Sequence, residues 1–476
     1  MSLPAARSAL FSNSVFIFLT RFLPSLANLG VLVLYSRGLS QEAYGHYQYF
    51  WIQLNVIYPF ICLGVHALIV AYPRALLVGL LRKIPASRWA MYLLWMIALA
   101  GVFAWLQARN GLLLFLPFLF IAVHSAGIIA ESFLVVCRSY KELVVSNLLY
   151  ATMFVEIHYS VLRDGFDLNR LFLQLLLLGG ARLLVYGVFV VRELRTAVAD
   201  MPETMQVNEI VGFWRHMGFY DISQVLFNWI DKFVVSLVLA ASLSAIYFNG
   251  SMSIPFLPLL LSAAGSSVLM QLADTDKGSD KEHIVAYMNY VGRMLSCVVF
   301  PLFFFLLLFR EELFVTLLTA KYAAAVPVFA ASILVLPLRA YSFTTVLQRY
   351  HQGRIINAGA IGDLIIACGL MYPLYRLMGL PGIALSFVIS TYIQSAYYLF
   401  HAGKVVGCSP AALLPYGNWL GKLIVFAFIF IIIHYVAVRF FSPMFGIIAG
   451  GALMIMMIGG SLATEQIMYK KHHGNK

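Results

Sequence analysis

Long apolar runs separated by short polar connections occupy most of the 476-residue chain. A helix that spans a membrane needs about 20 consecutive, mainly apolar residues, within a range of about 17–25. Runs of this length recur from one end of the chain to the other, and we expect each of them to cross the membrane once. The sequence therefore predicts an all-α polytopic membrane protein with about 14 transmembrane helices, at residues 9–35, 44–71, 88–107, 111–137, 142–162, 168–192, 214–240, 244–271, 285–309, 324–348, 355–376, 380–402, 416–438 and 444–466.

The composition of the chain is that of a membrane protein. Hydrophobic residues make up 62% of it and charged residues 11%, whereas a soluble domain averages about 45–50% apolar and about 25% charged residues. The excess apolar side chains must face lipid. The net charge of +12 does not indicate nucleic acid, because membrane proteins collect Lys and Arg in their cytoplasmic loops. The five cysteines show no metal-binding spacing, so we expect neither a metal nor a cofactor.

The distribution of basic residues predicts the orientation of the chain. Of the 32 Lys and Arg residues, we assign four to the membrane interior. With the N-terminus in the cytoplasm, we assign 20 of the others, including Lys422, to the cytoplasmic side and eight to the opposite side. Because an excess of Lys and Arg marks the cytoplasmic face, we predict that both termini are cytoplasmic.

The longest polar interruption, at residues 192–209, follows the sixth predicted span. An offset of 200 residues aligns Asn28 with Asn228 and Leu39 with Leu239. Many transporters are built from such structural repeats. We therefore predict four regions: a six-helix lobe at 1–192, a cytoplasmic linker at 193–212, a pseudo-symmetric six-helix lobe at 213–404, and two further helices with a basic tail at 405–476.

Ionisable residues inside the predicted spans are the candidate functional groups. A charge at the bilayer centre costs about 2.5–3.5 kcal/mol on insertion scales, so such a residue normally faces the protein interior or an aqueous cavity. The basic residues of this kind are Arg21, Arg182, Lys232 and Arg339. A carboxyl group held in a low-dielectric environment can change its protonation between two conformations. The candidates for ion coupling are Glu131, Glu156, Asp221 and Asp363.

Two predicted helices carry polar residues along one face. On the span at 214–240, an arc of about 80° holds Asp221, Gln224, Asn228 and Lys232. On the first span, a similar arc holds Arg21, Pro24, Ser25 and Asn28. The 200-residue offset brings these two stripes into register, so we predict that they line a central polar cavity between the lobes.

A structural role is the alternative for each of these residues, because hydrogen bonds between helices commonly hold membrane bundles together. Asp231 and Lys232 are adjacent and can form a local ion pair. The three histidines His66, His124 and His158 are predicted to be hydrogen-bonded core residues rather than proton carriers.

Several stretches resemble polysaccharide flippases of the Wzx type, which belong to the MOP superfamily (multidrug/oligosaccharidyl-lipid/polysaccharide exporters). LYSRGLSQEAYGHYQYF, residues 34–50, resembles the family's loop between helices one and two. NWIDKFVVSLVL and LSAIYFNGSMSIPFLPLL, at 228–239 and 243–260, resemble its helices seven and eight, although Ala245 stands where the family has glycine.

The likeness continues towards the C-terminus. LTAKYAAAVPVF, residues 318–329, resembles a G-x-x-Y-x-x-A stretch with Ala320 in place of glycine. The stretch at 352–386 resembles the family's G-R-x-x-N … P-x-x-G-x-x-G-x-A pattern through Gly353, Arg354, Asn357, Pro373, Gly379, Gly382 and Ala384, although five residues separate Pro373 from Gly379.

The resemblance implies two six-helix lobes related by a pseudo-twofold axis, with two helices appended. It implies a transporter, not an enzyme, which moves a polyprenyl-pyrophosphate-linked oligosaccharide from the inner to the outer leaflet of the bacterial inner membrane by alternating access. The expected context is the biosynthesis of a cell-surface polysaccharide such as the O-antigen of lipopolysaccharide. Membrane lipids and the polysaccharide polymerase machinery are the expected partners.

A diphosphate needs positive charge on its way through a low-dielectric layer, because Coulomb attraction and charge-assisted hydrogen bonds offset the loss of water. The candidate cations are Arg21, Arg182, Lys232 and Arg339. The candidate partners for sugar hydroxyls are Asn28, Gln224 and Asn228.

Three other functions fit part of the sequence. A MATE-like drug or cation antiporter would use carboxylates in its cavity, and a lipid II flippase would also suit fourteen helices and a cationic cavity. A membrane glycosyl polymerase or ligase usually presents a large external loop, which this chain lacks. The chain also contains no P-loop G-x-x-x-x-G-K-[ST] and no G-x-S-x-G or H-E-x-x-H motif, so these motifs give no support for ATP hydrolysis or for such hydrolases.

Overall fold

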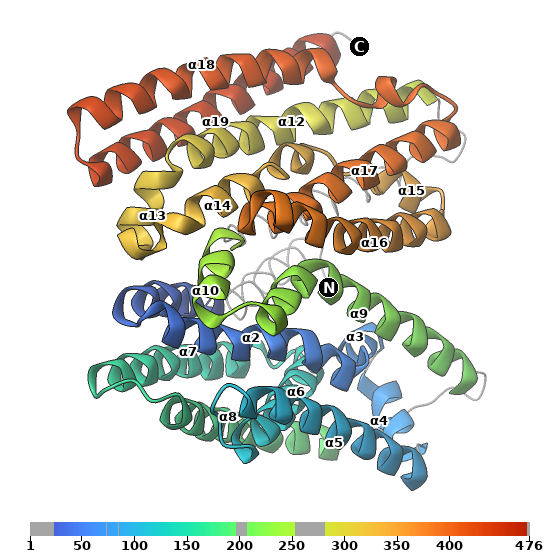
Figure 1. Ribbon diagram of the computed structural model, residues 1–476. Coiled ribbons are helices and arrows are strands. Elements are labelled where there is room, and N and C mark those ends of the chain that lie inside the picture. The colour runs from blue at the N-terminus through green and yellow to red at the C-terminus, as the bar shows by residue number, and fades with distance from the viewer. Residues whose placement is uncertain (1–22, 73, 84, 197–206, 253–280, 474–476) are drawn as a thin grey trace. The chain divides into compact units, whose positions relative to one another are not determined.

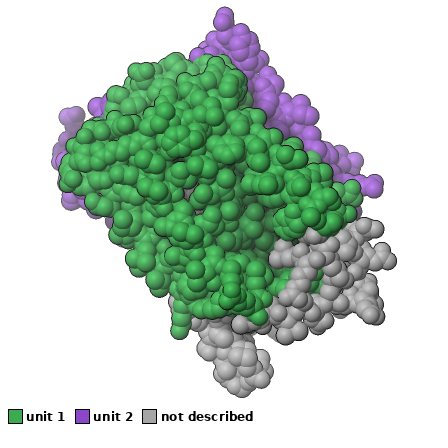
Figure 2. All heavy atoms as spheres, turned by 90° about the horizontal axis from the view of Figure 1, so that it is seen from below, with its two compact units in different colours: residues 1–245 green, residues 246–476 purple. Residues whose placement is uncertain are grey.

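The computed structural model describes residues 23–72, 74–83, 85–196, 207–252 and 281–473. The regular structure of these residues consists of helices (Figure 1). The chain divides into two compact units, residues 1–245 and 246–476, which Figure 2 draws in green and purple.

The first unit begins with a helix at residues 23–38. α6 packs along α8, and α2 packs along α9 and α5. Aromatic rings fill the centre of the unit, where Phe50 of α2 stacks on Phe172 of α8 with ring centroids 3.6 Å apart. The labelled helices are α2 (Gln41–Cys62), α3 (Val65–Ala71), α4 (Arg74–Lys83), α5 (Ala86–Ala108), α6 (Phe115–Val136), α7 (Tyr140–Arg163), α8 (Leu168–Thr196), α9 (Val207–Val238) and α10 (Ala241–Gly250), which continues into the second unit.

In the second unit, α16 packs along α17, and α12 packs along both α18 and α19. Several short helices lie between α12 and α16 along the chain. The helices of this unit are α12 (Lys281–Leu308), α13 (Arg310–Leu318), η1 (Ala320–Ala325), α14 (Val326–Ile333), η2 (Leu336–Ala340), α15 (Thr345–Arg349), α16 (Gly353–Met378), α17 (Leu380–Val406), η3 (Pro410–Leu413), α18 (Tyr416–Phe440) and α19 (Pro443–His473).

The chain is a multi-pass membrane protein. Among the described residues, nine helical segments are long and apolar enough to cross a membrane: α5, α6, α8, α12, the segment at 320–340, and α16 to α19. Two of the predicted spans, 9–35 and 244–271, lie largely outside the described residues. The total of fourteen transmembrane helices therefore stays a prediction.

The turn at residues 37–40 is built by a buried side chain and a helix cap. The first helix ends at Gly38, and Leu39 is buried. Ser40 begins α2 as its N-cap, since the backbone N–H of Ala43 donates to Ser40 Oγ at 3.2 Å. This hydrogen bond satisfies one of the N–H groups that a helix N-terminus leaves free.

A matching turn follows 200 residues later, where α9 ends at Val238 and α10 begins at Ala241. The start of α2 lies against this second turn. A Cβ atom at Gly45 would overlap the carbonyl oxygen of Ala241, so only glycine allows this approach. Tyr49 Oη also donates to the carbonyl of Leu239 at 2.7 Å. The Y-G-x-Y stretch thus places the start of α2 directly on the end of α9 and the start of α10.

The second predicted span, 44–71, is two helices. Leu63 and Gly64 both adopt left-handed backbone conformations, with φ 45° and 69°, and separate α2 from α3. Pro59 lies inside α2, and its carbonyl accepts a hydrogen bond from Leu63 N–H at 2.8 Å. Trp214 Nε1 of α9 donates to the Leu63 carbonyl at 2.7 Å. A side chain of α9 therefore satisfies a backbone group at this break.

The tenth predicted span, 324–348, is also broken rather than continuous. It consists of α14, η2 and α15, and Tyr341 between the last two has an extended backbone with φ −146°. Pro337 lies in the first turn of η2 and has no backbone N–H to donate. As a result, Arg339 lies in a short 3-10 helix and not in the middle of a long α-helix.

The lobe boundaries stay a prediction. α8 continues to Thr196 and α9 is described from Val207, so both helices extend into the predicted linker at 193–212. α9 packs along α2 and belongs to the first compact unit.

Candidate functional site

The polar face of α9 carries the first group of candidate residues. Lys232 Nζ lies 3.3 Å from Asp231 Oδ2, which confirms the predicted local ion pair. Only 15% of the Lys232 side chain is exposed, and its ammonium lies 5.8 Å from the ring centroid of Trp229. Asn228 is exposed, and Gln224 belongs to the same helix. α9 thus carries a largely buried cation, Lys232, whose charge is partly neutralised by Asp231. Asn228 and Gln224 precede it on the same helix.

A His–Asp pair joins α3 to α9. His66 Nε2 lies 3.5 Å from Asp221 Oδ1. The second oxygen of Asp221 and Nδ1 of His66 are buried, and neither has a hydrogen-bond partner in the described part of the chain. Tyr58 and Cys62 of α2 interact electrostatically with Asp221. Both members of this pair were candidate polar residues from the sequence, but their contact was not predicted.

Arg182, in the middle of α8, is held by a network of side chains. Its Nη2 donates to Glu131 Oε2 at 2.6 Å and to Asn147 Oδ1 at 2.7 Å. Its Nε donates to Tyr186 Oη at 2.9 Å, and its guanidinium lies 4.7 Å from the ring centroid of Tyr150. These partners come from α6, α7 and α8, so the network joins three helices of the first unit.

The Arg182 network borders a cavity of about 50 Å³, which is room for a few water molecules. His124 and Glu131 also line this cavity. The sequence analysis assigned a substrate-binding role to Arg182 and an ion-coupling role to Glu131, and the structure makes them one ion pair. Both roles stay predictions, and a substrate anion would have to compete with Glu131 for the guanidinium.

In the second unit, Arg339 and Asp363 interact electrostatically. Arg339 is exposed in η2, whereas Asp363 of α16 is buried. Asp363 Oδ1 accepts no hydrogen bond from the residues that the structure describes. The helix break thus holds a cation near a buried carboxyl group.

The remaining candidates are scattered or lie outside the description. Glu156 is exposed on α7, and no ion pair joins it to another described residue. Asn28 is exposed on the first helix. Arg21 lies outside the described residues, so the predicted register between the stripes of the first and seventh spans stays a prediction.

His158 is a hydrogen-bonded core residue, as predicted. It is fully buried; its Nε2 lies 3.1 Å from Tyr47 Oη and its Nδ1 lies 2.6 Å from the Phe154 carbonyl. Tyr35 Oη donates to the backbone carbonyl of His158 at 3.2 Å. Tyr47, the last residue of YGHY, is therefore engaged within the first unit.

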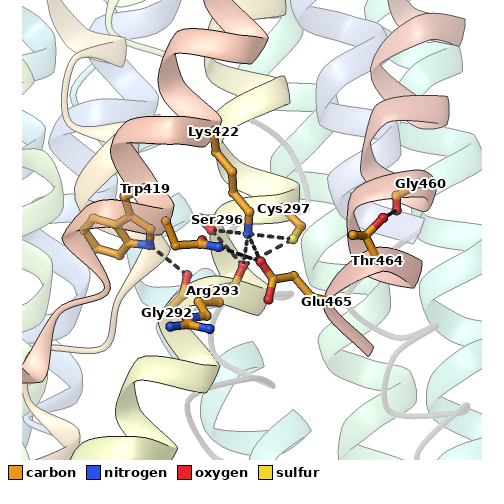
Figure 3. Close-up of polar contacts among 10 residues, drawn as sticks. Gly292, Arg293, Ser296, Cys297, Trp419, Lys422, Gly460, Thr464 and Glu465 are labelled. Atoms are coloured by element: carbon orange, nitrogen blue, oxygen red, sulfur yellow. Dashed lines mark hydrogen bonds and ion pairs between the residues drawn. The ribbon is translucent and has the colours of Figure 1, made fainter. Parts of the chain in front are cut away.

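The most deeply buried ion pair among the described residues was not predicted from the sequence. Lys422 of α18 and Glu465 of α19 lie 3.0 Å apart, with 12% and 4% of their side chains exposed. Figure 3 shows the ammonium among acceptors from α12, with hydrogen bonds to Ser296 Oγ at 3.0 Å and Cys297 Sγ at 3.1 Å. The sequence has one cation, Lys422, and one carboxylate, Glu465, in its two final apolar runs, and this could have indicated a pair. The pair was missed because Lys422 was assigned to the cytoplasmic surface.

Comparison with known proteins identifies the family of this chain. Residues 90–327, half of the chain, match the family described as polysaccharide biosynthesis protein. The structure is similar to that of the lipid II flippase MurJ in an inward closed conformation, with a TM-score of 0.65 and 12% identity over 97% of this chain and 99% of that chain. No curated protein matches the chain.

The structure is also similar to a multidrug resistance MATE family transporter of the MOP superfamily in an inward-facing conformation. The TM-score is 0.56 and the identity 14%, over 83% of this chain and 98% of that chain. At these identities the likeness establishes the fold, which this chain shares with both of these proteins.

Proposed function

Because the chain belongs to the polysaccharide biosynthesis protein family and has the fold of the MOP superfamily, we propose that it is a flippase for a polyprenyl-pyrophosphate-linked oligosaccharide. It moves this lipid from the inner to the outer leaflet by alternating access. Its proposed location is the inner membrane of a bacterium, with both termini in the cytoplasm. The polysaccharide polymerase machinery that uses the product is its proposed partner.

The observation that carries the proposal is the presence of cations on helices of the membrane region. Lys232 is largely buried on α9, and Arg339 is exposed at a helix break. A diphosphate that leaves water needs cationic partners, since charge-assisted hydrogen bonds are about twice as strong as neutral ones. Arg21 is proposed as a third diphosphate-binding cation. Arg182 is proposed as a fourth diphosphate-binding cation. The substrate can bind it only by displacing Glu131.

The helix break around Arg339 supports a binding role. Non-helical backbone at membrane depth is tolerated only where it is buried in protein or lines a water-filled cavity. In transporters, interrupted helices typically form the substrate site, because their free backbone groups bind polar ligands. The break between α14 and α15 offers such groups beside the side chain of Arg339.

Amide side chains are proposed to bind the sugar hydroxyls. An amide supplies both donors and acceptors, which matches hydroxyl groups that donate and accept. Asn28 and Asn228 are exposed, so both are accessible to a ligand. Gln224, one helical turn before Asn228, is proposed to act with them.

Carboxyl groups are proposed to couple transport to protons. The candidates are Glu131, Glu156, Asp221 and Asp363. Two of them form ion pairs: Glu131 pairs with Arg182, and Asp221 pairs with His66. Protonation of either carboxylate would weaken its ion pair, and this would link proton uptake to the packing of α6 on α8 or of α3 on α9.

Lipid II transport is the second candidate, because the fold extends over nearly the whole of the MurJ structure. Lipid II and a lipid-linked oligosaccharide both carry a polyprenyl diphosphate, so the cations suit either one. Drug or cation export is less favoured. A cationic cargo needs free carboxylates, and two of the four candidates, Glu131 and Asp221, are engaged by Arg182 and His66.

Complementation tests the proposal. The gene is expressed in a strain that lacks its polysaccharide flippase and, separately, in a strain depleted of its lipid II flippase, and mass spectrometry follows the lipid-linked intermediates. We expect the oligosaccharide-lipid pool to fall in the first strain and growth to stay arrested in the second. Rescue of the second strain alone would replace the oligosaccharide by lipid II as the substrate.

Variants then test the cations. Lys232→Ala and Arg21→Ala should lose transport at normal protein levels, and Arg21→Lys should retain much of it because positive charge is the main requirement. Loss of a hydrogen bond to a charged group costs about 1.5–3 kcal/mol, or roughly one to two decades in affinity. Arg376→Ala is the matched control, since Arg376 is exposed in the last turn of α16.

A further inference from the structure

A groove of about 530 Å³ opens between α7 and α8 of the first unit. Val145, Leu149 and Met153 lie at helical spacing along its α7 wall, and Leu178 and Val185 lie along its α8 wall. The three α7 side chains are 57%, 62% and 47% exposed. α7 contains the predicted span at 142–162, and apolar side chains of a membrane span that are exposed to this degree face hydrocarbon rather than water. The groove is therefore open to the lipid phase.

The groove has the length of one leaflet. Its lining runs from Lys141 to Met153 on α7 and from Leu178 to Phe189 on α8. At 1.5 Å per residue these distances are about 18 Å and about 17 Å. Half of a hydrocarbon core about 30 Å thick is about 15 Å. A single acyl chain of one leaflet therefore fits along the groove, whereas a long polyprenyl chain exceeds it.

One end of the groove is positively charged. Lys141 and Glu142 line this end, and Arg192 Nη2 lies 3.4 Å from Glu142 Oε1, so the acidic residue has a basic partner. Lys141 is exposed and has no acidic partner among the described residues, and the same is true of Arg138. The end of the groove that lies where the predicted topology puts the cytoplasm thus carries an excess of positive charge.

The floor of the groove is polar but satisfied. Arg182 and Tyr150 line both the groove and the small cavity behind it. The guanidinium is already bound by Glu131 and Asn147. An anionic group therefore finds available positive charge at the Lys141 end and not at the floor.

We propose that this groove binds one anionic phospholipid of the cytoplasmic leaflet. One acyl chain lies between the apolar walls of α7 and α8, and the phosphate lies at Lys141, where the first-turn N–H groups of α7 also favour an anion. The phosphate position at Lys141 is separate from the cations proposed to bind the diphosphate, although one of them, Arg182, also lines the groove. The inference does not depend on which substrate the protein carries. Binding of this lipid requires the apolar walls of both helices and the positively charged end of the groove.

The experiment measures lipid binding to the purified full-length chain. The protein is reconstituted in nanodiscs that contain equal amounts of phosphatidylglycerol and phosphatidylcholine, released, and weighed by native mass spectrometry. We expect one retained phosphatidylglycerol per chain. Lys141→Gln should lower the preference for phosphatidylglycerol roughly fivefold, equivalent to about 1 kcal/mol for one basic residue near an anionic headgroup. Arg88→Gln, an exposed cation at the start of α5, should leave it unchanged.

A second variant tests the walls. Leu149→Trp fills the groove and should abolish retention of the lipid, while Leu184→Trp places the same ring on a 74% exposed position of α8 outside the groove and should not. Equal retention of both lipids by the wild type, or full retention by Leu149→Trp, would overturn the proposal. Displacement of phosphatidylglycerol by undecaprenyl phosphate would also overturn it, because the groove would then hold a polyprenyl chain.

Discussion

Lys422 Nζ lies 3.0 Å from Glu465 Oε1, and both side chains are withdrawn from the surface between α12, α18 and α19 (Figure 3). The ammonium also donates to the Arg293 carbonyl at 2.7 Å. Asn418 Nδ2 donates to Glu465 Oε1 at 2.7 Å. The ammonium is thus surrounded by hydrogen-bond acceptors and its counter-ion. This cluster of charged and polar groups links both helices at the end of the chain to α12, in addition to their apolar packing on it.

Glu465→Gln is expected to destabilise the protein strongly. Removing one partner of a buried ion pair leaves an uncompensated charge and costs about 3–5 kcal/mol. The thermal unfolding midpoint in detergent should fall by several degrees. Glu311→Gln is the control, because Glu311 is 71% exposed and pairs with Arg310 only at 3.8 Å.

The double variant Lys422→Met/Glu465→Leu is expected to unfold close to the wild-type midpoint, since apolar residues of similar volume often replace a buried pair without loss. A double variant as unstable as Glu465→Gln would show that the cluster acts through specific hydrogen bonds and not through charge balance.

Arg182 and Glu131 are expected to be coupled in stability. The pair is about a quarter exposed, at 22% and 28%, so each single change to methionine should cost about 1–3 kcal/mol. The sum of the two single effects should exceed the effect of the double change by at least about 0.5 kcal/mol. Unfolding midpoints of the four proteins provide the measurement. If Arg182→Met lost transport while its midpoint matched the wild type, Arg182 would belong to the substrate site and not to the packing of α6 on α8.

Asp363→Asn is expected to change the response of transport to pH. Asp363 is buried with one oxygen lacking a partner among the described residues, so its carboxyl group can gain and lose a proton as the conformation changes. The amide cannot do so, and transport into inverted vesicles should become less dependent on pH. Glu311→Asn is a surface control. Unaltered pH dependence in Asp363→Asn combined with Glu131→Gln and Asp221→Asn would exclude proton coupling through these groups.

Gly45→Ala is expected to be harmful although it adds only one methyl group. The new Cβ overlaps the Ala241 carbonyl, and overpacking of this kind costs about 1–3 kcal/mol. Gly101→Ala in α5 meets no atom within 4 Å and should be neutral or stabilising by about 0.5–1 kcal/mol. The two unfolding midpoints should therefore move in opposite directions. A midpoint for Gly45→Ala at or above that of the wild type would mean that α2 moves away from Ala241 easily.

The sequence by itself determined the class of the protein. A chain that crosses a bilayer must form long apolar helices, because their backbone groups hydrogen-bond within the helix. The long apolar runs of the sequence predict such helices directly. Effects that act over a few residues were equally visible. The Asp231–Lys232 pair is local, and His158 could be predicted to be a core residue because an ionisable ring within an apolar helix needs hydrogen-bond partners.

Only the tertiary structure decided which polar groups meet. Helical periodicity assigns a residue to a face but does not say which other helix covers that face. Lys422 and Glu465 looked like members of two unrelated apolar runs, and Arg182 and Glu131 looked like groups with separate roles. Their pairing depends on how α18 packs on α19 and how α6 packs on α8.

The positions of the helix breaks also depend on tertiary structure. Hydropathy carries no information about backbone dihedral angles. By hydropathy alone, the runs at 44–71 and 324–348 are therefore uninterrupted spans. Pro337 was a local signal of a break, but the left-handed residues Leu63 and Gly64 are stabilised by a distant partner, Trp214 of α9. A backbone group freed inside a membrane protein needs a hydrogen-bond partner from another helix, and only the folded chain supplies it.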